Sequence, residues 1–519
     1  MFILNILAFI FVLGLVIMLH ELGHFIMARR AGILCHEFAI GMGPIVYSKK
    51  KGETLYSVRA IPIGGFVSMA GEEINDDLVK VGKDIKVRKE NGRITHIILN
   101  PEDERYPSAE RVTVEFVDLK AQDGEALMIN HMEVDEKAFY VLKDKKIQIA
   151  PYNRQFDSKT LWQRFTTIFA GPMMNFILAF FLFAIIAMVV GFPKTDAEGN
   201  TTLEIGHVQA GQPAYGNIEV GDTITHIDGE PVQSWEEMHQ VMSAKQGQRE
   251  ILFTVDRDGQ SHDYTLTPVI FLVAIGIQSE REEDVAVWDP EVVRIGNVIN
   301  NGPAASAGLQ TGDLILSVDG NPVPDWTTLI EAVRANAEGS RMLFEVERDG
   351  ATETFEVEPY QHDLIESQGA PVVQSRIGIS PVHERDIPRA LFSGSITGII
   401  NSSTMIFDTL SMLFSGVVGV GDLAGPVGIY SVTASAFQQG LISLLSWTAL
   451  LSVNLGILNL LPIPALDGGR IVFLGYEGIT RKKVNKTVEN YLHLIMFILL
   501  ITLLLFVTYN DILRLFNLG

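Results

Sequence analysis

Three stretches of this chain are long and apolar enough to cross a lipid bilayer, and they limit its possible folds more than any other feature. A membrane-spanning helix needs about 20 mostly apolar residues, and Ile3–Ala28, Ile168–Phe192 and Leu492–Tyr509 meet that need. A fourth apolar stretch, Leu441–Pro462, is broken at its end by prolines. No Lys or Arg precedes Arg29 and no cleavage motif follows the first stretch, so we expect a retained span and not a signal peptide. The pattern predicts a polytopic α-helical membrane protein with four transmembrane helices.

Between the second and third spans the sequence repeats itself. A segment that starts at Ile205 is matched by one that starts at Ile295. The matched positions are Gly221-Asp222 with Gly312-Asp313, Asp228-Gly229 with Asp319-Gly320, and Trp235 with Trp326. Each copy shows short β-branched strands, Gly-Asp and Asp-Gly turns, and one helix after the tryptophan. This pattern resembles bacterial PDZ domains, which add a peptide strand to a sheet edge. It predicts two PDZ-like α+β domains, and two spacer domains without a ligand are the alternative.

The region 75–160 is charged, and apolar residues alternate with polar ones in "RITHIILN", "RVTVEFVDL" and "KKIQIAPY". This alternation predicts a small β-rich insertion. The formal net charge of the whole chain is −22, so charge gives no support for binding nucleic acid. The single cysteine, Cys35, cannot form an internal disulfide and says little about the redox compartment.

His20, Glu21 and His24 form an H-E-x-x-H motif near the end of the first span. On a helix, positions i and i+4 share a face, so both imidazoles can bind one metal ion while Glu21 reaches a metal-bound water. Ionisable residues inside a membrane span are costly and usually functional. The alternative is a polar helix end that reaches the membrane interface.

A catalytic zinc ion needs a third protein ligand and an open coordination position. The best candidate is Asp467 in "NLGILNLLPIPALDGGR", where Pro462 and Pro464 break the third span and Gly468 and Gly469 free the backbone. Irregular backbone at membrane depth is tolerated only beside protein or a watery cavity. A carboxylate there needs a partner, which a zinc ion on two histidines would provide. The alternative is that Asp467 caps the next helix.

These motifs resemble the site-2 intramembrane zinc metalloprotease family, and with PDZ domains between the second and third spans they are similar to its bacterial RseP/RasP type. The resemblance rests on "HELGH" in a first span, N-x4-N-x2-P-x-P-x-L-D-G in a third, and the segments "APYNRQFDSKT" and "AGPMMNF". It implies zinc bound by His20, His24 and Asp467, with Glu21 as the general base. It also implies that Asn454 and Asn459 help to hold the substrate strand near the metal. The long insertion and the doubled PDZ domain depart from many members of the family.

The resemblance also implies the substrates. Family members cut single-pass membrane proteins within the lipid bilayer, after an upstream site-1-type protease has trimmed the outer domain. Anti-sigma factors and remnant signal peptides are such substrates. The two PDZ-like domains would then act as a size filter or read the new chain terminus.

The segment "LYSVRAIPIGGFVSMAG" has alternating apolar positions, which include Val58, and a Gly64-Gly65 pair that suggests a turn. It resembles the re-entrant β-hairpin of the family, which would offer an edge for strand addition by a substrate. An ordinary cytosolic hairpin is the alternative.

Both halves of the expected zinc site must lie on the same side of the membrane. Basic residues follow each half, and the positive-inside rule therefore places both in the cytoplasm. They are Arg29, Arg30, Lys49, Lys50 and Lys51 after the first span, and Arg481, Lys482, Lys483 and Lys486 after Asp467. Four spans satisfy this arrangement and put the repeats outside a bacterial cytoplasmic membrane. A fifth span within 391–420 would separate His20 from Asp467, so we expect that weakly apolar region to lie along the outer interface.

The expected order along the chain follows from these arguments. It is a first transmembrane helix with H-E-x-x-H (1–30), a membrane-associated hairpin region (31–74), a cytosolic β-rich insertion (75–160), a second transmembrane helix (161–193), PDZ-like domains (200–285 and 286–362), an interfacial amphipathic segment (386–436), a third transmembrane helix (437–475) and a fourth (488–512). Two rival functions remain at this point, a membrane-anchored PDZ adaptor with an inactive metal site and a zinc protease that cuts loops outside the membrane.

Overall fold

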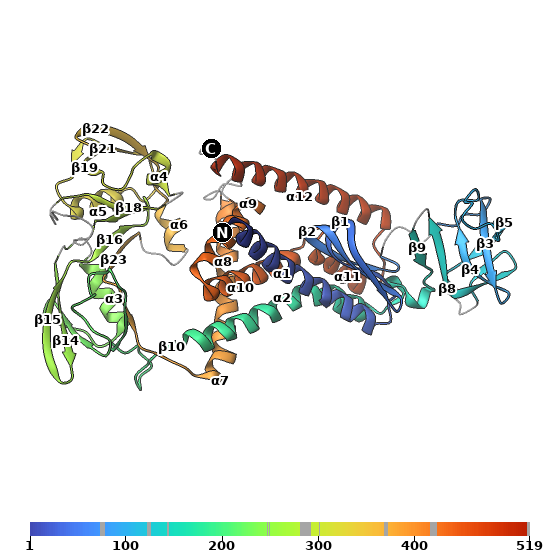
Figure 1. Cartoon of the computed structure of the whole chain (residues 1–519), viewed down its shortest axis with the longest axis horizontal. Coiled ribbons are helices and arrows are strands. Elements are labelled where there is room, and N and C mark those ends of the chain that lie inside the picture. Colours follow the sequence, from blue (N-terminus) through green and yellow to red (C-terminus); the bar gives the residue numbers. More distant parts are fainter. Residues whose placement is uncertain are drawn as a thin grey trace. The chain divides into compact units, whose positions relative to one another are not determined.

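The computed structural model describes residues 1–72, 78–121, 126–142, 145–245, 248, 250–280, 292–299, 302–367, 372–415 and 423–515. The chain divides into two compact units (Figure 1). The first comprises Met1–Ala184, Gly394–Ser403 and Gly421–Ile512, and the second comprises Ile185–Ser393, Thr404–Val420 and Leu513–Gly519. The predicted start of the insertion at 75 and the predicted domain boundary at 285/286 lie outside the described residues.

Apolar helices dominate the first unit, because a helix satisfies its own backbone hydrogen bonds as a lipid environment requires. These helices are α1 (Phe2–Arg30), α2 (Leu161–Val190), α9 (Pro426–Gln439), α10 (Leu441–Leu460), α11 (Asp467–Thr480) and α12 (Lys486–Leu515). Helix α10 ends at Leu460, just before Pro462 and Pro464, which cannot continue a helix. The predicted third span is therefore two helices, α10 and α11, with irregular backbone between them.

Five helices among the described residues are long and apolar enough to span a membrane. They include α1, α2, α10 and most of α12. The fifth covers Ile387–Ser411 and takes in α7 (Ile387–Arg389), a π-helical turn (Ala390–Gly394) and most of α8 (Ser395–Ser415). It has the lowest mean hydropathy of the five. Length and composition alone allow this segment to cross a membrane, so its interfacial placement stays a prediction.

Helices α1, α2 and α10 pack closely because small residues line their contacts. A β-carbon at Gly23 of α1 would collide with the backbone carbonyl of Ala170 on α2. The Oγ of Ser452 on α10 donates a hydrogen bond to the backbone carbonyl of Asn175 on α2, at 2.8 Å. Helix α2 therefore contacts both α1, which carries the two histidines, and α10, which precedes Asp467.

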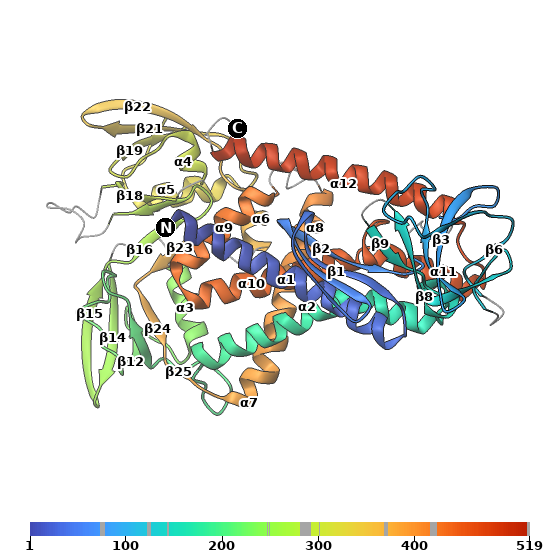
Figure 2. The same ribbon diagram turned by 45° about the vertical axis from the view of Figure 1, so that its right-hand side comes forward.

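Strands β1 (Cys35–Lys51) and β2 (Thr54–Met69) form a folded sheet next to α1 (Figure 2). Both strands are long and bent, so the first half of β1 lies between the two halves of β2. Phe38, for example, pairs with Tyr56 on one side and with Val67 on the other. Across the sheet, the order of segments is 45–51, 54–59, 37–40 and 65–69. The edges of the sheet are therefore 45–51 and 65–69.

The insertion after this sheet is a small β-domain. Its strands are β3 (Asp84–Glu90), β4 (Arg93–Ile98), β5 (Glu110–Thr113), β6 (Val117–Asp118), β7 (Met128–Ile129), β8 (Met132–Leu142) and β9 (Lys145–Gln148). They pair in the order β5-β3-β4-β8-β7-β6, with β9 also on β8. Arg154, which follows β9, donates hydrogen bonds to both carboxylate oxygens of Glu53 at the tip of the β1–β2 sheet, at 2.9 and 2.6 Å. These bonds lower the pKa of Glu53 to about 2.

The second unit contains two matching repeats. The first has β11 (Ile205–Val208), β12 (Thr223–Ile227), β13 (Glu230–Pro231), α3 (Trp235–Ala244), β14 (Ile251–Arg257) and β15 (Gln260–Leu266). The second has β18 (Ile295–Val298), α4 (Pro303–Ala307), β19 (Leu314–Val318), β20 (Asn321–Pro322), α5 (Trp326–Ala335), β21 (Met342–Arg348) and β22 (Ala351–Val357). Their main sheets have the same order, β13-β12-β14-β15 and β20-β19-β21-β22.

The repeats exchange strands. After the first repeat the chain forms β16 (Val269–Leu272) and β17 (Ile277–Ser279), and β17 pairs with β18 of the second repeat. After the second repeat it forms β23 (Val373–Arg376) and β24 (Ile379–Pro381), and β24 pairs with β11 of the first. Strands β16 and β23 pair with each other. The first repeat is thus completed by a strand that follows the second.

This nesting differs from the domain limits expected from the sequence. Strands β16 and β17 precede 285 yet belong to the second repeat, and β24 follows 362 yet belongs to the first. The two repeats therefore form one continuous structure up to Pro381. Just outside them, β10 (Phe192–Pro193) pairs with β25 (His383–Glu384), so the chain enters and leaves the repeats side by side.

Candidate metal centre

His20 and His24 lie one helical turn apart on the same face of α1, as the i, i+4 spacing predicts. Both are buried, at 7% and 8% exposure. Their Nε2 atoms are 3.2 Å apart. Two unprotonated ring nitrogens at this distance repel each other unless a cation lies between them.

Asp467 completes this cluster from a distant part of the chain. Its Oδ2 lies 3.2 Å from Nε2 of His20 and 3.4 Å from Nε2 of His24. Asp467 is the first residue of α11, and the N-cap position belongs to Leu466, so a capping role for the carboxylate is not supported. The positive end of the helix dipole favours the ionised carboxylate at this position.

The backbone before α11 is shaped by a tight turn. The amide of Leu466 donates a hydrogen bond to the carbonyl of Ile463 at 3.0 Å, and Pro464 and Ala465 lie between them. Ala465 has φ of +92°, as the third position of a type II turn requires. An L-residue is strained at this angle by about 1–3 kcal/mol.

Gly468 and Gly469 have a different role from the one expected. Neither has a positive φ, and both lie in α11. A β-carbon at Gly469 would lie 2.5 Å from the carbonyl oxygen of Ile463, and one at Gly468 would collide with the carbonyl of Leu461. The glycines are thus needed because α11 turns back tightly against the end of α10, and not because they free the backbone.

The three ligand atoms fit a tetrahedral metal ion. Zinc binds histidine nitrogen at about 2.0–2.1 Å and carboxylate oxygen at about 2.0–2.2 Å, which makes the edge of a tetrahedral site about 3.3–3.5 Å. The observed separations of 3.2, 3.2 and 3.4 Å are close to that edge. In addition, the buried Oδ2 of Asp467 has no hydrogen-bond donor among the described residues. The donor set of two imidazoles and one carboxylate suits zinc and leaves a fourth position for water.

Helix α2 orients both imidazoles. The backbone carbonyl of Thr167 accepts a hydrogen bond from Nδ1 of His24 at 2.9 Å, which leaves the Nε2 lone pair free for a metal. The side-chain amide of Asn175 lies 3.2 Å from Nδ1 of His20. Because amide oxygen and nitrogen are assigned from the surrounding network, a rotated amide would accept the Nδ1 proton through Oδ1, which has no other partner among the described residues. Gly171 gives the His24 ring its space, since a β-carbon there would collide with Nε2.

Sequence reasoning assigned no role to Thr167, Gly171 or Asn175. A backbone carbonyl has no sequence signature, because every residue carries one. Asn175 and Gly171 lie in "AGPMMNF". The polar amide of Asn175 inside an apolar span is the one sequence feature that indicates a functional role for this segment.

Glu21 lies beside the edge strand of the β1–β2 sheet. A β-carbon at Gly65 would lie 3.1 Å from Cγ of Glu21 and 2.9 Å from the carbonyl oxygen of Ala39. Glycine at this position therefore lets segment 65–69 pass directly beside Glu21. The structure brings together the expected base and one of the expected hairpin residues.

The other expected hairpin residues lie elsewhere. Val58 pairs with both Ile40 and Tyr47, so it is inside the sheet and cannot offer a free edge. Gly64 has φ of +82° but lies within β2, against Met42. The predicted turn near Gly64-Gly65 agrees with the pairing, because 55–58 run parallel to 37–40 whereas 65–68 run antiparallel to them, so the chain reverses direction between 59 and 65. A second, two-residue turn at 52–53 joins β1 and β2.

Asn454 and Asn459 both lie on α10, shortly before its end. Nδ2 of Asn459 donates to the backbone carbonyl of Leu455 within the same helix, at 3.0 Å. Within the described part of the chain, no hydrogen bond joins either amide to His20, His24 or Asp467. Their expected role at the substrate therefore stays a prediction.

Comparison with known proteins places this site in a family. The model of Peptidase family M50 matches residues 8–503. The chain is 33% identical over 525 residues to the "Regulator of sigma-W protease RasP" of Bacillus subtilis (strain 168), covering 99% of this chain and 100% of that protein. It is 34% identical over 521 residues to the "Zinc metalloprotease RasP" of Bacillus licheniformis, covering 99% of each chain. The solved PDZ domain of HtrA3, bound to a phage-derived ligand, is 31% identical over 16% of this chain and 82% of that one, with a TM-score of 0.14.

These relatives identify the cofactor as Zn²⁺, and together with the long apolar helices they identify the chain as a multi-pass protein of the cell membrane. The family match over residues 8–503, together with the near-complete overlap with named zinc metalloproteases, establishes that this chain is a zinc metalloprotease belonging to peptidase family M50.

Proposed function

We propose that this enzyme hydrolyses a peptide bond within the transmembrane segment of single-pass proteins that another protease has already trimmed. The observation that carries the proposal is the position of the ligand cluster. His20 and His24 lie on a helix long and apolar enough to span a bilayer, and Asp467 follows a second such helix. Anti-sigma factors and remnant signal peptides are the substrate class, which the name of the Bacillus subtilis relative as a regulator of sigma-W supports.

The residues of the site divide the chemistry between them. His20, His24 and Asp467 would hold the zinc, which when bound would polarise the scissile carbonyl and lower the pKa of a water toward ~7. Glu21 accepts the proton of the attacking water and passes it to the leaving amine. The hydrogen bond from His24 to the Thr167 carbonyl keeps the imidazole in the tautomer that binds metal.

The substrate reaches this buried site as an extended strand. A peptide bond in a helix is shielded by its own hydrogen bonds, so the substrate helix unwinds locally before it is cut. Segment 65–69 offers a sheet edge beside Glu21, where an unwound segment adds as a further strand. Asn454 and Asn459 hold that strand from the side of α10.

Matched proline variants test strand addition at segment 65–69, because Ser68→Pro changes this edge of the sheet and Ser48→Pro changes the opposite edge, 45–51. Equal cleavage by two stably folded variants would contradict it.

We place the zinc site toward the cytoplasm and the repeats outside the membrane, with four spans and with α8 at the outer interface. The basic residues after α1 and α11 support this arrangement. So does the contact of Gly398 in α8 with Phe183 near the end of α2.

Labelling of single cysteines in whole cells, in a Cys35→Ser background, tests this membrane topology. A cysteine at Ser234 should react from outside and one at Ser158 should not.

The repeats act as a filter that excludes substrates with intact outer domains. Because Pro193 pairs with His383, residues 195–381 can be replaced by a short glycine-rich loop. The shortened enzyme should cut untrimmed substrates that the full chain leaves intact. Continued rejection of those substrates would contradict the filter.

Cleavage of a defined substrate tests the central proposal. A single-pass protein without its outer domain is incubated with the purified enzyme in a defined bilayer, and the cut site is mapped. Glu21→Gln should lower the rate by about 10²–10⁴-fold, because general base catalysis contributes that much, while its zinc content stays that of the wild type. A cut inside the apolar segment supports the intramembrane enzyme. A cut that stays in a loop when the apolar segment is moved favours the rival protease, and no cut of any trimmed substrate favours the adaptor.

A further inference from the structure

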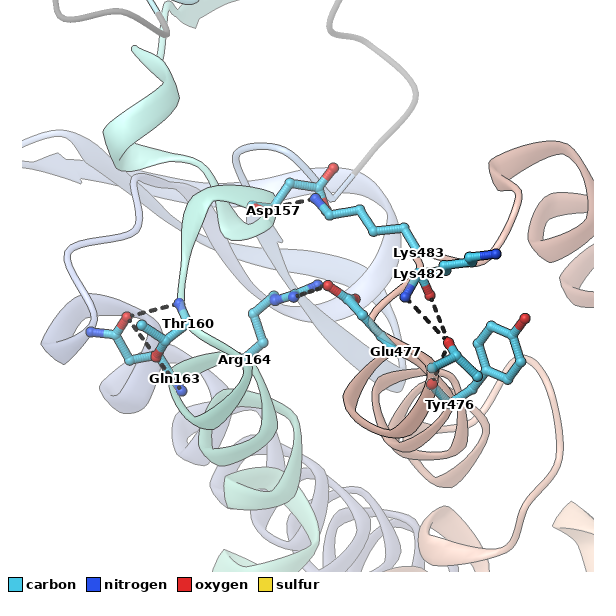
Figure 3. A network of polar contacts seen from close by, with 9 residues as sticks. Asp157, Thr160, Gln163, Arg164, Tyr476, Glu477, Lys482 and Lys483 are labelled. Carbon is cyan, nitrogen blue, oxygen red and sulfur yellow. Dashed lines mark hydrogen bonds and ion pairs between the residues drawn. The ribbon is translucent and has the colours of Figure 1, made fainter.

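Helix α11 is held at both of its ends. Asp467, its first residue, faces the two histidines of α1. Ten residues later, Glu477 accepts two hydrogen bonds from the guanidinium of Arg164 on α2, at 2.9 and 2.7 Å (Figure 3). Since a helix rises 1.5 Å per residue, these two attachment points are about 15 Å apart.

The Arg164–Glu477 pair fixes the relative position of α2 and α11 more than it adds to the stability of the fold. Arg164 is 6% exposed, and the side chain of Glu477 is 17% exposed. Removing two charges from water is costly and often offsets what their attraction gains. The Nε of Arg164 is also buried without a hydrogen-bond partner among the described residues. A planar guanidinium that bonds both carboxylate oxygens, however, fixes distance and angle together, which a single charge contact does not.

The pair connects the helix that orients a histidine with the helix that carries the aspartate. Arg164 precedes Thr167 by three residues on α2, and the carbonyl of Thr167 accepts the Nδ1 proton of His24. Glu477 and Asp467 lie on α11. A displacement of α11 along α2 would therefore move Asp467 relative to His24.

The turn between α10 and α11 fixes the start of α11 against α10, whereas Arg164 and Glu477 fix α11 against α2. Between α10 and Asp467 the backbone is an irregular turn, strained at Ala465. At the far end of α11, by contrast, the contacts gather at the start of α2. Gly478 lies against Leu161, and Nζ of Lys483 donates to the carbonyl of Asp157 at 3.4 Å (Figure 3). Arg164 and Glu477 make the shortest and most directional of these contacts.

We propose that Arg164 and Glu477 are positioning residues that set where Asp467 stands relative to His20 and His24. The proposal rests on the proposed ligand set. It assigns to the pair no contact with substrate or metal. It predicts that loss of the pair weakens zinc binding and distorts the metal geometry without unfolding the protein.

Two variants distinguish the loss of positioning from the separate cost of burying a charge without its partner. Arg164→Met combined with Glu477→Gln removes both charges and leaves neither one buried without its partner. Arg164→Lys keeps the charge but loses the two parallel hydrogen bonds. As a matched control, Arg93→Met with Glu133→Gln removes an exposed ion pair of the insertion, whose atoms are 2.9 Å apart.

The measurements use the full chain in lipid nanodiscs. Zinc affinity is determined by competition with a chelator, metal geometry from the visible spectrum of the Co²⁺-loaded protein, and folding from the unfolding temperature of the metal-free protein. The neutral double variant should lose roughly tenfold in zinc affinity, which is the lower end of the effect of residues that orient metal ligands. Its Co²⁺ spectrum should shift, and the control should match the wild type in all three.

If the double variant has the zinc affinity and the Co²⁺ spectrum of the wild type, the proposal is wrong. If that variant does not fold, Arg164→Lys decides, because an unchanged spectrum would show that the two-bond geometry is not needed. Asp467→Asn separately tests the ligand set on which the proposal rests. If it binds zinc as the wild type does, the proposed ligand set is wrong. If it abolishes binding while the pair variants have no effect, only the positioning role fails.

Discussion

The first repeat joins Arg257 to Asp222 by two hydrogen bonds, and the second joins Arg348 to Asp313 in the same way. The four bonds measure 2.7, 2.7, 2.7 and 2.6 Å. Both aspartates are 1% exposed. The duplicated Gly-Asp positions thus carry the same internal bond, which ties the start of one strand to the end of another.

The repeats differ in their strand edges and in their cores. Among the described strands, β17 of the second repeat lies between β16 and β18, whereas β24 of the first pairs only with β11. Trp326 is 1% exposed in the core of the second repeat. Its counterpart Trp235 is only partly buried against the core of the first. Duplication has kept the internal framework, while the edges and the depth of the core have diverged.

The tryptophan pair should give the largest difference. Trp326→Ala removes a fully buried aromatic side chain and should destabilise the second repeat by about 3–5 kcal/mol. Trp235→Ala removes less buried surface and should cost the first repeat about 1–2 kcal/mol. Amide exchange of β21 and β14, measured by mass spectrometry in the full chain, reports the two repeats separately. Equal losses would show that the two cores are equivalent after all.

The strand exchange predicts an effect at a distance along the sequence. Ile377 follows the second repeat but is 6% exposed within the core of the first. Ile377→Ala should therefore destabilise the first repeat by about 2–4 kcal/mol. Faster amide exchange should appear in β14, while β21 changes less. The reverse pattern would mean that β24 belongs to the second repeat, and the nesting would be wrong.

The third and smallest effect concerns pH. Burial, the largest single influence, would raise the pKa of Asp222, but the hydrogen bonds from Arg257 and from the Glu219 amide, together with the charge of Arg257, outweigh it and hold that pKa below its ordinary value of 3.8. A carboxylate with a lowered folded pKa contributes stability at neutral pH, and that contribution is lost as the pH falls below about 4. Asp222→Asn should cost the first repeat about 1.5–3 kcal/mol at pH 7.

The acid dependence provides the check. Urea unfolding followed by amide exchange of β14, between pH 7 and pH 3, should show a loss of stability in the wild type that Asp222→Asn largely lacks. An identical slope in both proteins would mean that the acid sensitivity of the first repeat arises from other carboxylates.

The sequence predicts those features whose signal is local. The spacing of His20 and His24 places them on one helical face, the Asp-Gly pairs predict turns that the structure confirms at positive φ for Asp228 and Asp319, and the family resemblance is confirmed. The prediction of Asp467 as a third ligand rests on the prolines and the acidic residue that interrupt an apolar run, and the structure brings its Oδ2 to 3.2 and 3.4 Å from the two histidines.

The features that could not be predicted depend on partners far along the chain. The β pattern of 55–71 was visible, but no local signal shows that segment 65–69 faces Glu21 while Val58 lies inside the sheet, since a pattern sets the face of a strand and not its neighbours. The sequence does not predict that β17 pairs with the second repeat and β24 with the first, because the residue pattern of each strand would fit either repeat.

The pairing of Phe192 with Glu384 and of Pro193 with His383 has an evolutionary consequence. Because the two chain ends already meet there, everything from 194 to 382 is, for the rest of the polypeptide, a single insertion closed at its base. The entropy of closing a loop grows slowly, by only ~0.6 kcal/mol for each doubling of its length. Domains can therefore be gained, duplicated or exchanged at this junction at little thermodynamic cost. The inserted domains can thus change over generations while the helices that carry His20, His24 and Asp467 stay as they are.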